Sequence, residues 1–215
     1  MPKEQIAMRL CCAMAPADIG VLRNAPHKLP KEEFTAYTNA VVMLKNVPMQ
    51  INDTSRPSIA NIRESIRKTQ HQYGLVGAVL VDYLQIMKTT KPFAREDLKI
   101  AYFTGELKAM AKEFNCVIVL LSQLNRELEK RPNKRPVLSD LRESGAIEQD
   151  ADQIIFLYRD EIYNKESQFR GIAEAIVGKN RHGEAGTAYM HAQLKYCQFT
   201  NLDHDALNQI QGNLI

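Results

Sequence analysis

The 215-residue sequence lacks the features of several specialised protein classes. It contains no apolar run near the roughly 20 residues that a membrane-spanning helix requires, and its N-terminus has no basic leader of a secretion signal. Its four cysteines do not have the paired spacing of a zinc site. The net charge of +3 is too small to identify a nucleic-acid binder by itself. We therefore expect a cytoplasmic protein with no membrane partner.

The sequence also lacks the side-chain spacing of two common classes of hydrolase. His182, His191 and His204 have no spacing typical of metal ligands, and no histidine near Ser122 in the sequence is placed to act as a base. We exclude a metal hydrolase and a serine hydrolase.

The first part of the chain has a helical pattern of apolar residues. Pro16 and Gly20 should end the first helix, Ser58 should cap a later one, and Gly74 should stop it. Helices are predicted over residues 3–14, 31–46 and 59–73, and a short strand over 47–53.

Two continuous apolar runs indicate buried parallel strands. LVGAVLV (75–81) ends at Asp82, and CVIVLL (116–121) ends at Ser122 and Gln123. The residues between them have helical spacing, which favours a right-handed parallel crossover. Strands without polar alternation are typical of sheets covered by helices on both faces, so we expect an α/β fold. Further strands are predicted over 153–158 and 172–177, followed by a possible antiparallel extension over 187–199 and a tail over 203–215.

Asp82 and Gln123 are the first candidate site residues. In an open parallel sheet, ligands bind beyond the carboxyl ends of the strands. A carboxylate there can hold Mg²⁺ through water, and an amide can contact a phosphate or orient a nucleophilic water. The alternative is that Asp82 only ends an apolar run.

The segment 126–145 is rich in basic residues and interrupted by Pro132 and Pro136. Such a loop next to a nucleotide-site strand would suit contacts to a phosphodiester backbone. The alternative is a solvated loop whose cations only confer solubility. Its basic residues are Arg126, Lys130, Arg131, Lys134, Arg135 and Arg142.

Lys179 and Arg181 lie in GKNRHGEAG (178–186), and on an extended backbone both project to one side. Together they could clamp a polyphosphate, or Arg181 could reach a neighbouring subunit as an arginine finger. The alternative is a glycine-rich hairpin with exposed cations.

Several long segments together resemble the C-terminal motor domain of DnaB-family replicative DNA helicases, from residue 1 to about 202. They are MPKEQIAMR, VLVDYLQIM, LLSQLNRELEKRPNKRPVLSDLRESGAIEQDADQIIFLYRDE and IAEAIVGKNRHGEAGT. The resemblance implies a RecA-like fold, with a mostly parallel sheet flanked by helices and antiparallel C-terminal strands. It also implies hexameric rings around single-stranded DNA that use ATP and Mg²⁺ for 5′ to 3′ unwinding.

The resemblance also implies roles for the candidate residues. Asp82 corresponds to the Walker B carboxylate that positions Mg²⁺, and Gln123 to the residue that senses the γ-phosphate. In DLRESG, Arg142, Glu143 and Gly145 correspond to the contacts with the DNA backbone. The pair offered to ATP on the adjacent subunit corresponds to Lys179 and Arg181, with Arg181 as the finger.

The sequence departs from that family in one respect. The phosphate loop G-x-x-x-x-G-K-[ST] does not occur, and the family's catalytic glutamate would immediately precede the position of Met1. We therefore expect a partial motor domain over 1–202 that lacks the phosphate-loop strand and does not split ATP alone. The alternative is a non-catalytic DNA-binding or ring-assembly module, or a remnant of a helicase gene.

The partners expected from the resemblance are single-stranded DNA, further copies in a homo-hexamer or mixed ring, primase and a helicase loader. An upstream fragment that carries the phosphate loop would complete the ATP site. A recombinase-like RecA relative would share the fold but should not show the block from DLRESG to IEQDAD in this form.

Overall fold

The computed structural model describes residues 1–141 and 145–203. The chain divides into two compact units. Unit 1 comprises 1–53, 157–175 and the residues from 187 on, and unit 2 comprises 54–156 and 176–186. The predicted contacts Arg142 and Glu143, and the tail beyond Asp203, lie outside the described residues.

The helices of unit 1 pack through small residues. They are α1 (Lys3–Met14), α2 (Ile19–Asn24) and α3 (Lys31–Lys45). Cys11 and Ala15 pack with Ala40 of α3, and the small side chains allow α1 and α3 to approach closely. Burial raises the pKa of the Cys12 thiol to about 11, so the thiol is protonated at neutral pH. The predicted helices over 3–14 and 31–46 are confirmed, the second ending one residue earlier.

Two predictions in this unit are wrong. Gly20 does not end a helix but lies inside α2, because the Asp18 carboxylate caps that helix by accepting from the Gly20 and Val21 amides at 2.8 and 3.1 Å. The segment 47–53 is not a strand. The Met49 amide donates to the Val47 carbonyl at 2.8 Å, which forms a tight turn instead of a ladder.

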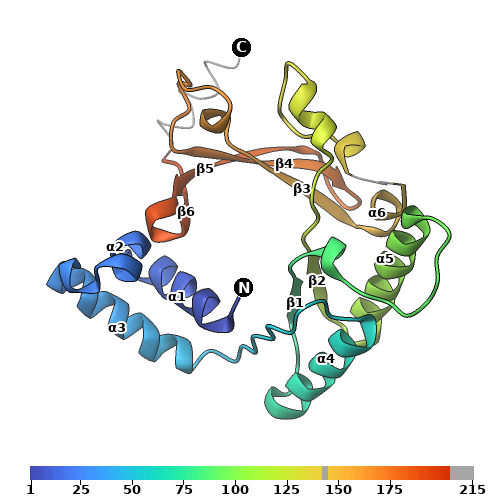
Figure 1. Cartoon of the computed structure of the whole chain (residues 1–215), viewed down its shortest axis with the longest axis horizontal. Helices are drawn as coiled ribbons and strands as arrows, with labels where there is room; N and C mark the ends of the chain where they lie inside the picture. Colours follow the sequence, from blue (N-terminus) through green and yellow to red (C-terminus); the bar gives the residue numbers. More distant parts are fainter. Residues whose placement is uncertain (142–144, 204–215) are drawn as a thin grey trace. The chain divides into compact units, whose positions relative to one another are not determined.

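The predicted strand–helix–strand arrangement with parallel strands is confirmed in unit 2. Strand β1 (Ala78–Val81) leads through α5 (Glu96–Glu113) to β2 (Val117–Leu120), which pairs parallel with β1 in the register Ala78 to Val117. Helix α4 (Ile59–Tyr73) precedes β1 and is predicted correctly at both ends. Ser58 and Asn61 form a reciprocal capping box, and Gly74 follows with a φ of 87°, which favours glycine. Figure 1 shows these elements together.

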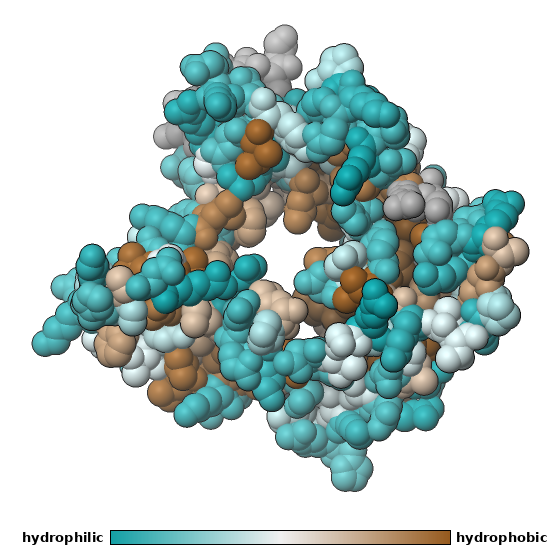
Figure 2. Space-filling view, in the orientation of Figure 1, coloured by the Kyte–Doolittle hydropathy of each residue, from teal (hydrophilic) through white to brown (hydrophobic). Residues whose placement is uncertain are grey.

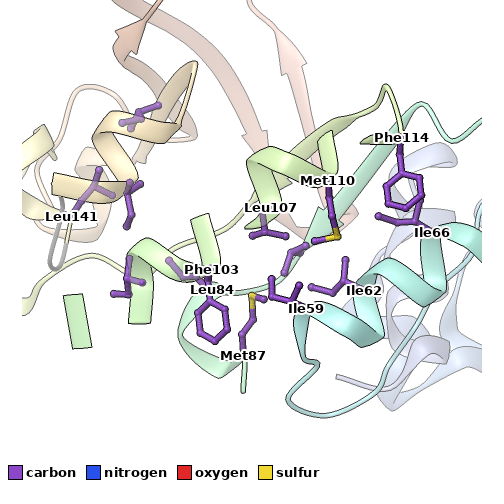
Figure 3. Close-up of a cluster of buried hydrophobic side chains, with 14 of the residues drawn as sticks. Ile59, Ile62, Ile66, Leu84, Met87, Phe103, Leu107, Met110, Phe114 and Leu141 are labelled. Atoms are coloured by element: carbon purple, nitrogen blue, oxygen red, sulfur yellow. The ribbon is translucent and has the colours of Figure 1, made fainter. Parts of the chain in front are cut away.

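The core of unit 2 lies between α4, α5 and one face of β1 and β2. Ile59, Ile62 and Ile66 point from α4 toward Leu107 and Met110 of α5 (Figure 3). Val79, Val81, Ile118 and Leu120 pack against this cluster from the strands. The core therefore fixes the two strands against α4 and α5.

The opposite face of β1 and β2 is open, contrary to the expectation that helices cover both faces. Both α4 and α5 pack on the same side, so the apolar residues of the other side remain exposed. Figure 2 shows apolar side chains at the surface among hydrophilic ones. The exposed fractions are 71% for Leu80, 62% for Val117, 44% for Val119 and 43% for Leu121.

The later strands form a second sheet in the order β3, β4, β5, β6. The predicted antiparallel extension over 187–199 is two strands, β5 and β6, which pair antiparallel. A short 3-10 turn and Cys197, whose φ of 54° is left-handed, separate them. The α/β class with parallel and antiparallel strands is therefore confirmed. The strands are β3 (Gln153–Tyr158), β4 (Ile172–Asn180), β5 (Gly186–Gln193) and β6 (Gln198–Asn201).

Candidate functional site

The parallel pairing brings the ends of β1 and β2 to one edge of the sheet. Val81 lies opposite Leu120 in the register, and the Leu121 amide donates to the Val81 carbonyl at 3.0 Å. Asp82 therefore follows β1 at the same edge at which Ser122 and Gln123 follow β2. This is the edge at which open parallel sheets bind ligands.

Gln85 joins these two strand ends and was missed by the sequence analysis. Its side-chain amide nitrogen donates to the Ser122 hydroxyl at 3.0 Å and to the Gln123 carbonyl at 3.4 Å. Its side-chain oxygen accepts from the Gln123 amide at 3.2 Å. The only sequence signal is a polar residue within the short turn LQI, three residues beyond Asp82.

Asp82 has a carboxylate that is available to a ligand. The residue is exposed, and its side chain has no hydrogen-bond or ion-pair partner within 1–141 and 145–203. No group of three metal-ligating side chains occurs in the described part of the chain. A single exposed carboxylate can hold Mg²⁺ together with water and phosphate oxygens, so the Asp82 side chain is suited to this ion.

The basic segment after β2 is a closed loop. The amide of Asn125 donates to the Asp140 carbonyl at 2.7 Å, and Leu124 forms a bridge with Leu141. The buried Asp140 carboxylate accepts from Arg131 at 2.8 Å, and Arg131 also donates to the Arg135 carbonyl at 2.9 Å. Asp140, which the sequence analysis did not single out, thus anchors Arg131 inside the loop.

The lysines of this loop lie nearer to solvent. Lys130 pairs with Glu127 at 2.7 Å, and both side chains are exposed. Lys134 donates to the Glu129 carbonyl. These weak, solvent-exposed contacts can exchange for a phosphate at little cost, unlike the contact of Arg131 with buried Asp140.

Lys179 and Arg181 converge on the end of helix α6 (Gly145–Asp150). Lys179 donates to the Glu148 carbonyl and, at 2.8 Å, to the Ala151 carbonyl. The carbonyls at a helix C-terminus lack partners within the helix and carry partial negative charge, so they attract cations.

Arg181 binds the same end of α6. It donates to the Gln149 carbonyl at 2.9 Å and pairs with the Asp152 carboxylate at 3.0 Å. Both cations therefore reach toward the same helix end. Gly145, predicted to contact DNA, begins this helix and directly follows the undescribed residues 142–144.

Asp152 also accepts from Lys108 of α5. This hydrogen bond, together with the charges of Lys108 and Arg181, holds the pKa of Asp152 below its usual value of 3.8. Asp152 is therefore anionic at neutral pH. Asp152 was not predicted as a site residue, because nothing in the local sequence pattern indicates two cationic partners from distant elements.

The chain matches the family described as "DnaB-like helicase C terminal domain" over residues 1–201. It belongs to this family. It is 41% identical over 203 residues to "Replicative DNA helicase DnaB" of Haemophilus influenzae and 37% identical over 204 residues to that of Geobacillus stearothermophilus. The matches cover 94% of this chain but 43% and 44% of those helicases, so the chain spans less than half of their length.

Two solved structures have the same fold as this chain. One, an ATPase domain, superposes with a TM-score of 0.89 at 35% identity and covers 94% of this chain and 72% of that one. A DnaB-like replicative helicase, studied with its interactions with primase, gives a TM-score of 0.89 at 35% identity, with coverages of 94% and 49%. The RecA-like α/β class expected from the resemblance is confirmed. In the described residues, no helix is long and apolar enough to cross a membrane.

Proposed function

We propose that this chain is the helicase part of a replicative DNA helicase that hydrolyses ATP and unwinds duplex DNA 5′ to 3′ as a ring. The observation that carries the proposal is the pair of parallel strand ends, where exposed Asp82 lies at the same edge as Gln123. Gln85 fixes the main chain of Gln123 at that edge. This arrangement suits a nucleotide with its metal ion.

Asp82 would position Mg²⁺, which neutralises charge on the phosphates when bound. Gln123 would contact the γ-phosphate from the adjoining strand end. The pattern G-x-x-x-x-G-K-[ST] does not occur in these 215 residues, so residues other than these would form the cradle for the triphosphate. An upstream fragment that carries the phosphate loop is the proposed source.

The DNA-binding surface would combine the segment Arg142–Gly145 with the basic loop before it. Lys130 and Lys134 hold only weak contacts near solvent and can contact phosphates. Arg135 belongs to the same loop, and its carbonyl is bound by Arg131. Arg131 would act mainly by holding the loop on buried Asp140.

Lys179 and Arg181 would act on the ATP of an adjacent subunit. This role requires a second subunit, in a homo-hexamer or a mixed ring. Lys179 lies in β4 and Arg181 directly follows it, whereas Asp82 follows β1 and Gln123 follows β2. Residues 1–202 would form one part of this motor. Primase and a helicase loader are the further proposed partners.

ATP hydrolysis tests this proposal. The chain is assayed alone and mixed with a polypeptide that carries the phosphate loop, with and without single-stranded DNA. We expect no hydrolysis by the chain alone and DNA-stimulated hydrolysis by the mixture. Asp82→Asn should abolish that activity, whereas Glu166→Gln, which removes another exposed carboxylate, should not. Full activity of the chain alone, or equal activity of the two variants, would refute the proposal.

A further inference from the structure

Asp152 lies between two cations that come from different elements of unit 2. Lys108 of α5 donates to one carboxylate oxygen, and Arg181 donates to the other at 3.0 Å. The Arg181 amide also donates to the Asp152 carbonyl at 2.8 Å. Residue 152 therefore holds both the main chain and the side chain of Arg181.

Main-chain carbonyls at the end of α6 also accept hydrogen bonds from the two cations Lys179 and Arg181. Lys179 donates to the Glu148 and Ala151 carbonyls, and Arg181 donates to the Gln149 carbonyl. Both cations proposed for a neighbour's phosphates are thus bound within their own unit. The contacts resemble those that an anion would make, because helix C-terminal carbonyls carry partial negative charge.

These contacts are exchangeable. The side chains of Asp152 and Arg181 are 47% and 45% exposed, and ion pairs in contact with water contribute little to stability. A polyphosphate carries several charges and can accept paired hydrogen bonds from a guanidinium. It can therefore replace a single carboxylate as the partner of Arg181.

We infer that Asp152 is an internal competitor, which holds Arg181 against α6 until a phosphate displaces it. Lys108 also binds the Asp152 carboxylate and so partly neutralises its charge. The ion pair between Asp152 and Arg181 is therefore weaker, and a phosphate replaces Asp152 more easily. The inference rests on the proposed role of Arg181 as a phosphate ligand. In addition to that role, Asp152 determines how readily the Arg181 side chain is released to bind a phosphate.

The test is binding of inorganic tripolyphosphate to the whole chain, measured by titration calorimetry. Asp152→Asn should bind about two- to fivefold more tightly than the wild type, the gain expected from removing one exposed ion pair. Asp152→Glu, which keeps the carboxylate, should bind like the wild type. Glu184→Gln is the matched control, because it removes the same charge from an exposed residue in the turn after Arg181.

A second variant, Lys108→Met, tests the opposite change. It removes the hydrogen bond from Lys108 to Asp152, so that Arg181 is the remaining cationic partner of the Asp152 side chain. It should weaken binding more than Lys112→Met does, a change of the same type at an exposed position of α5. This pair decides the inference even where Asp152→Asn impairs folding. Equal binding by the two lysine variants, or no gain in folded Asp152→Asn beyond that of Glu184→Gln, would overturn it.

Arg181→Ala separates this inference from the proposed function. If Arg181→Ala weakens binding while folded Asp152→Asn matches the wild type, Arg181 is a phosphate ligand and Asp152 is not its competitor. If Arg181→Ala changes nothing, or if no variant binds, the proposed phosphate role of Arg181 fails, and this inference fails with it.

Discussion

The side chain of Gln85 holds the main chain of Gln123 on both sides, accepting from its amide at 3.2 Å and donating to its carbonyl at 3.4 Å. Gln85 follows β1 and Gln123 follows β2, so this contact ties the two strand ends directly to each other. We regard Gln85 as the residue that keeps Asp82 and Gln123 in a fixed relation.

Replacing Gln85 by alanine should loosen the end of β2. The variant loses hydrogen bonds to Ser122 and Gln123, each worth about 1 kcal/mol at most in a solvated position. We expect faster amide hydrogen exchange at Gln123, measured by mass spectrometry or NMR, with little change in the core. Gln72→Ala, at an exposed position of α4, should leave that exchange unchanged. Unaltered exchange at Gln123 in Gln85→Ala would show that Gln85 does not fix this end.

Gly178 is required by the close approach of Phe156. A Cβ at residue 178 would lie 2.6 Å from a ring carbon of Phe156, which is buried and 3% exposed. Gly178→Ala should therefore lower the free energy of unfolding by about 1–3 kcal/mol through overpacking. Urea denaturation measures this change. Gly186→Ala is the control, because a Cβ there meets no atom within 4 Å, and equal stability of the two variants would contradict the steric account.

The open face of β1 and β2 should promote self-association. Exposed contiguous apolar surface favours association with other apolar surfaces. Leu80 is 71% exposed and Val119 is 44% exposed on this face. Leu80→Lys should reduce binding of an apolar dye and the tendency to aggregate in light scattering, without loss of helical circular dichroism. Leu75→Lys, at a 91% exposed residue before β1, is the control, and an equal effect of both would argue against a role of this particular face.

Local sequence signals predicted local structure well. The helix at 59–73 was predicted at both ends because its signals, Ser58 and Gly74, act within one turn. The positions of Asp82 after β1 and of Gln123 after β2 were predicted because an apolar run and its polar end are adjacent in sequence. The prediction that Gly20 ends a helix was wrong, since a glycine is tolerated inside a helix that Asp18 caps.

The remaining features depend on contacts between distant residues. The partners of Gln85, Asp140 and Asp152 come from other elements, so no local pattern indicates them. The open sheet face was missed for a similar reason. An apolar run does not tell whether helices cover one face or both.

The central claim is that this chain binds the backbone of single-stranded DNA through the segment that begins at Arg142. Binding of single-stranded DNA tests this claim most directly. The measurement is the anisotropy of a labelled single-stranded oligonucleotide as a function of salt, for the wild type, Arg142→Ala and Arg67→Ala. Arg67 is an exposed residue of α4, so its replacement controls for the loss of one positive charge. We predict that Arg142→Ala lowers affinity for all sequences alike and reduces the slope of log K against log salt by about 0.7, the value for one phosphate contact on a single strand. An Arg142→Ala variant with the affinity and salt slope of Arg67→Ala would contradict the account.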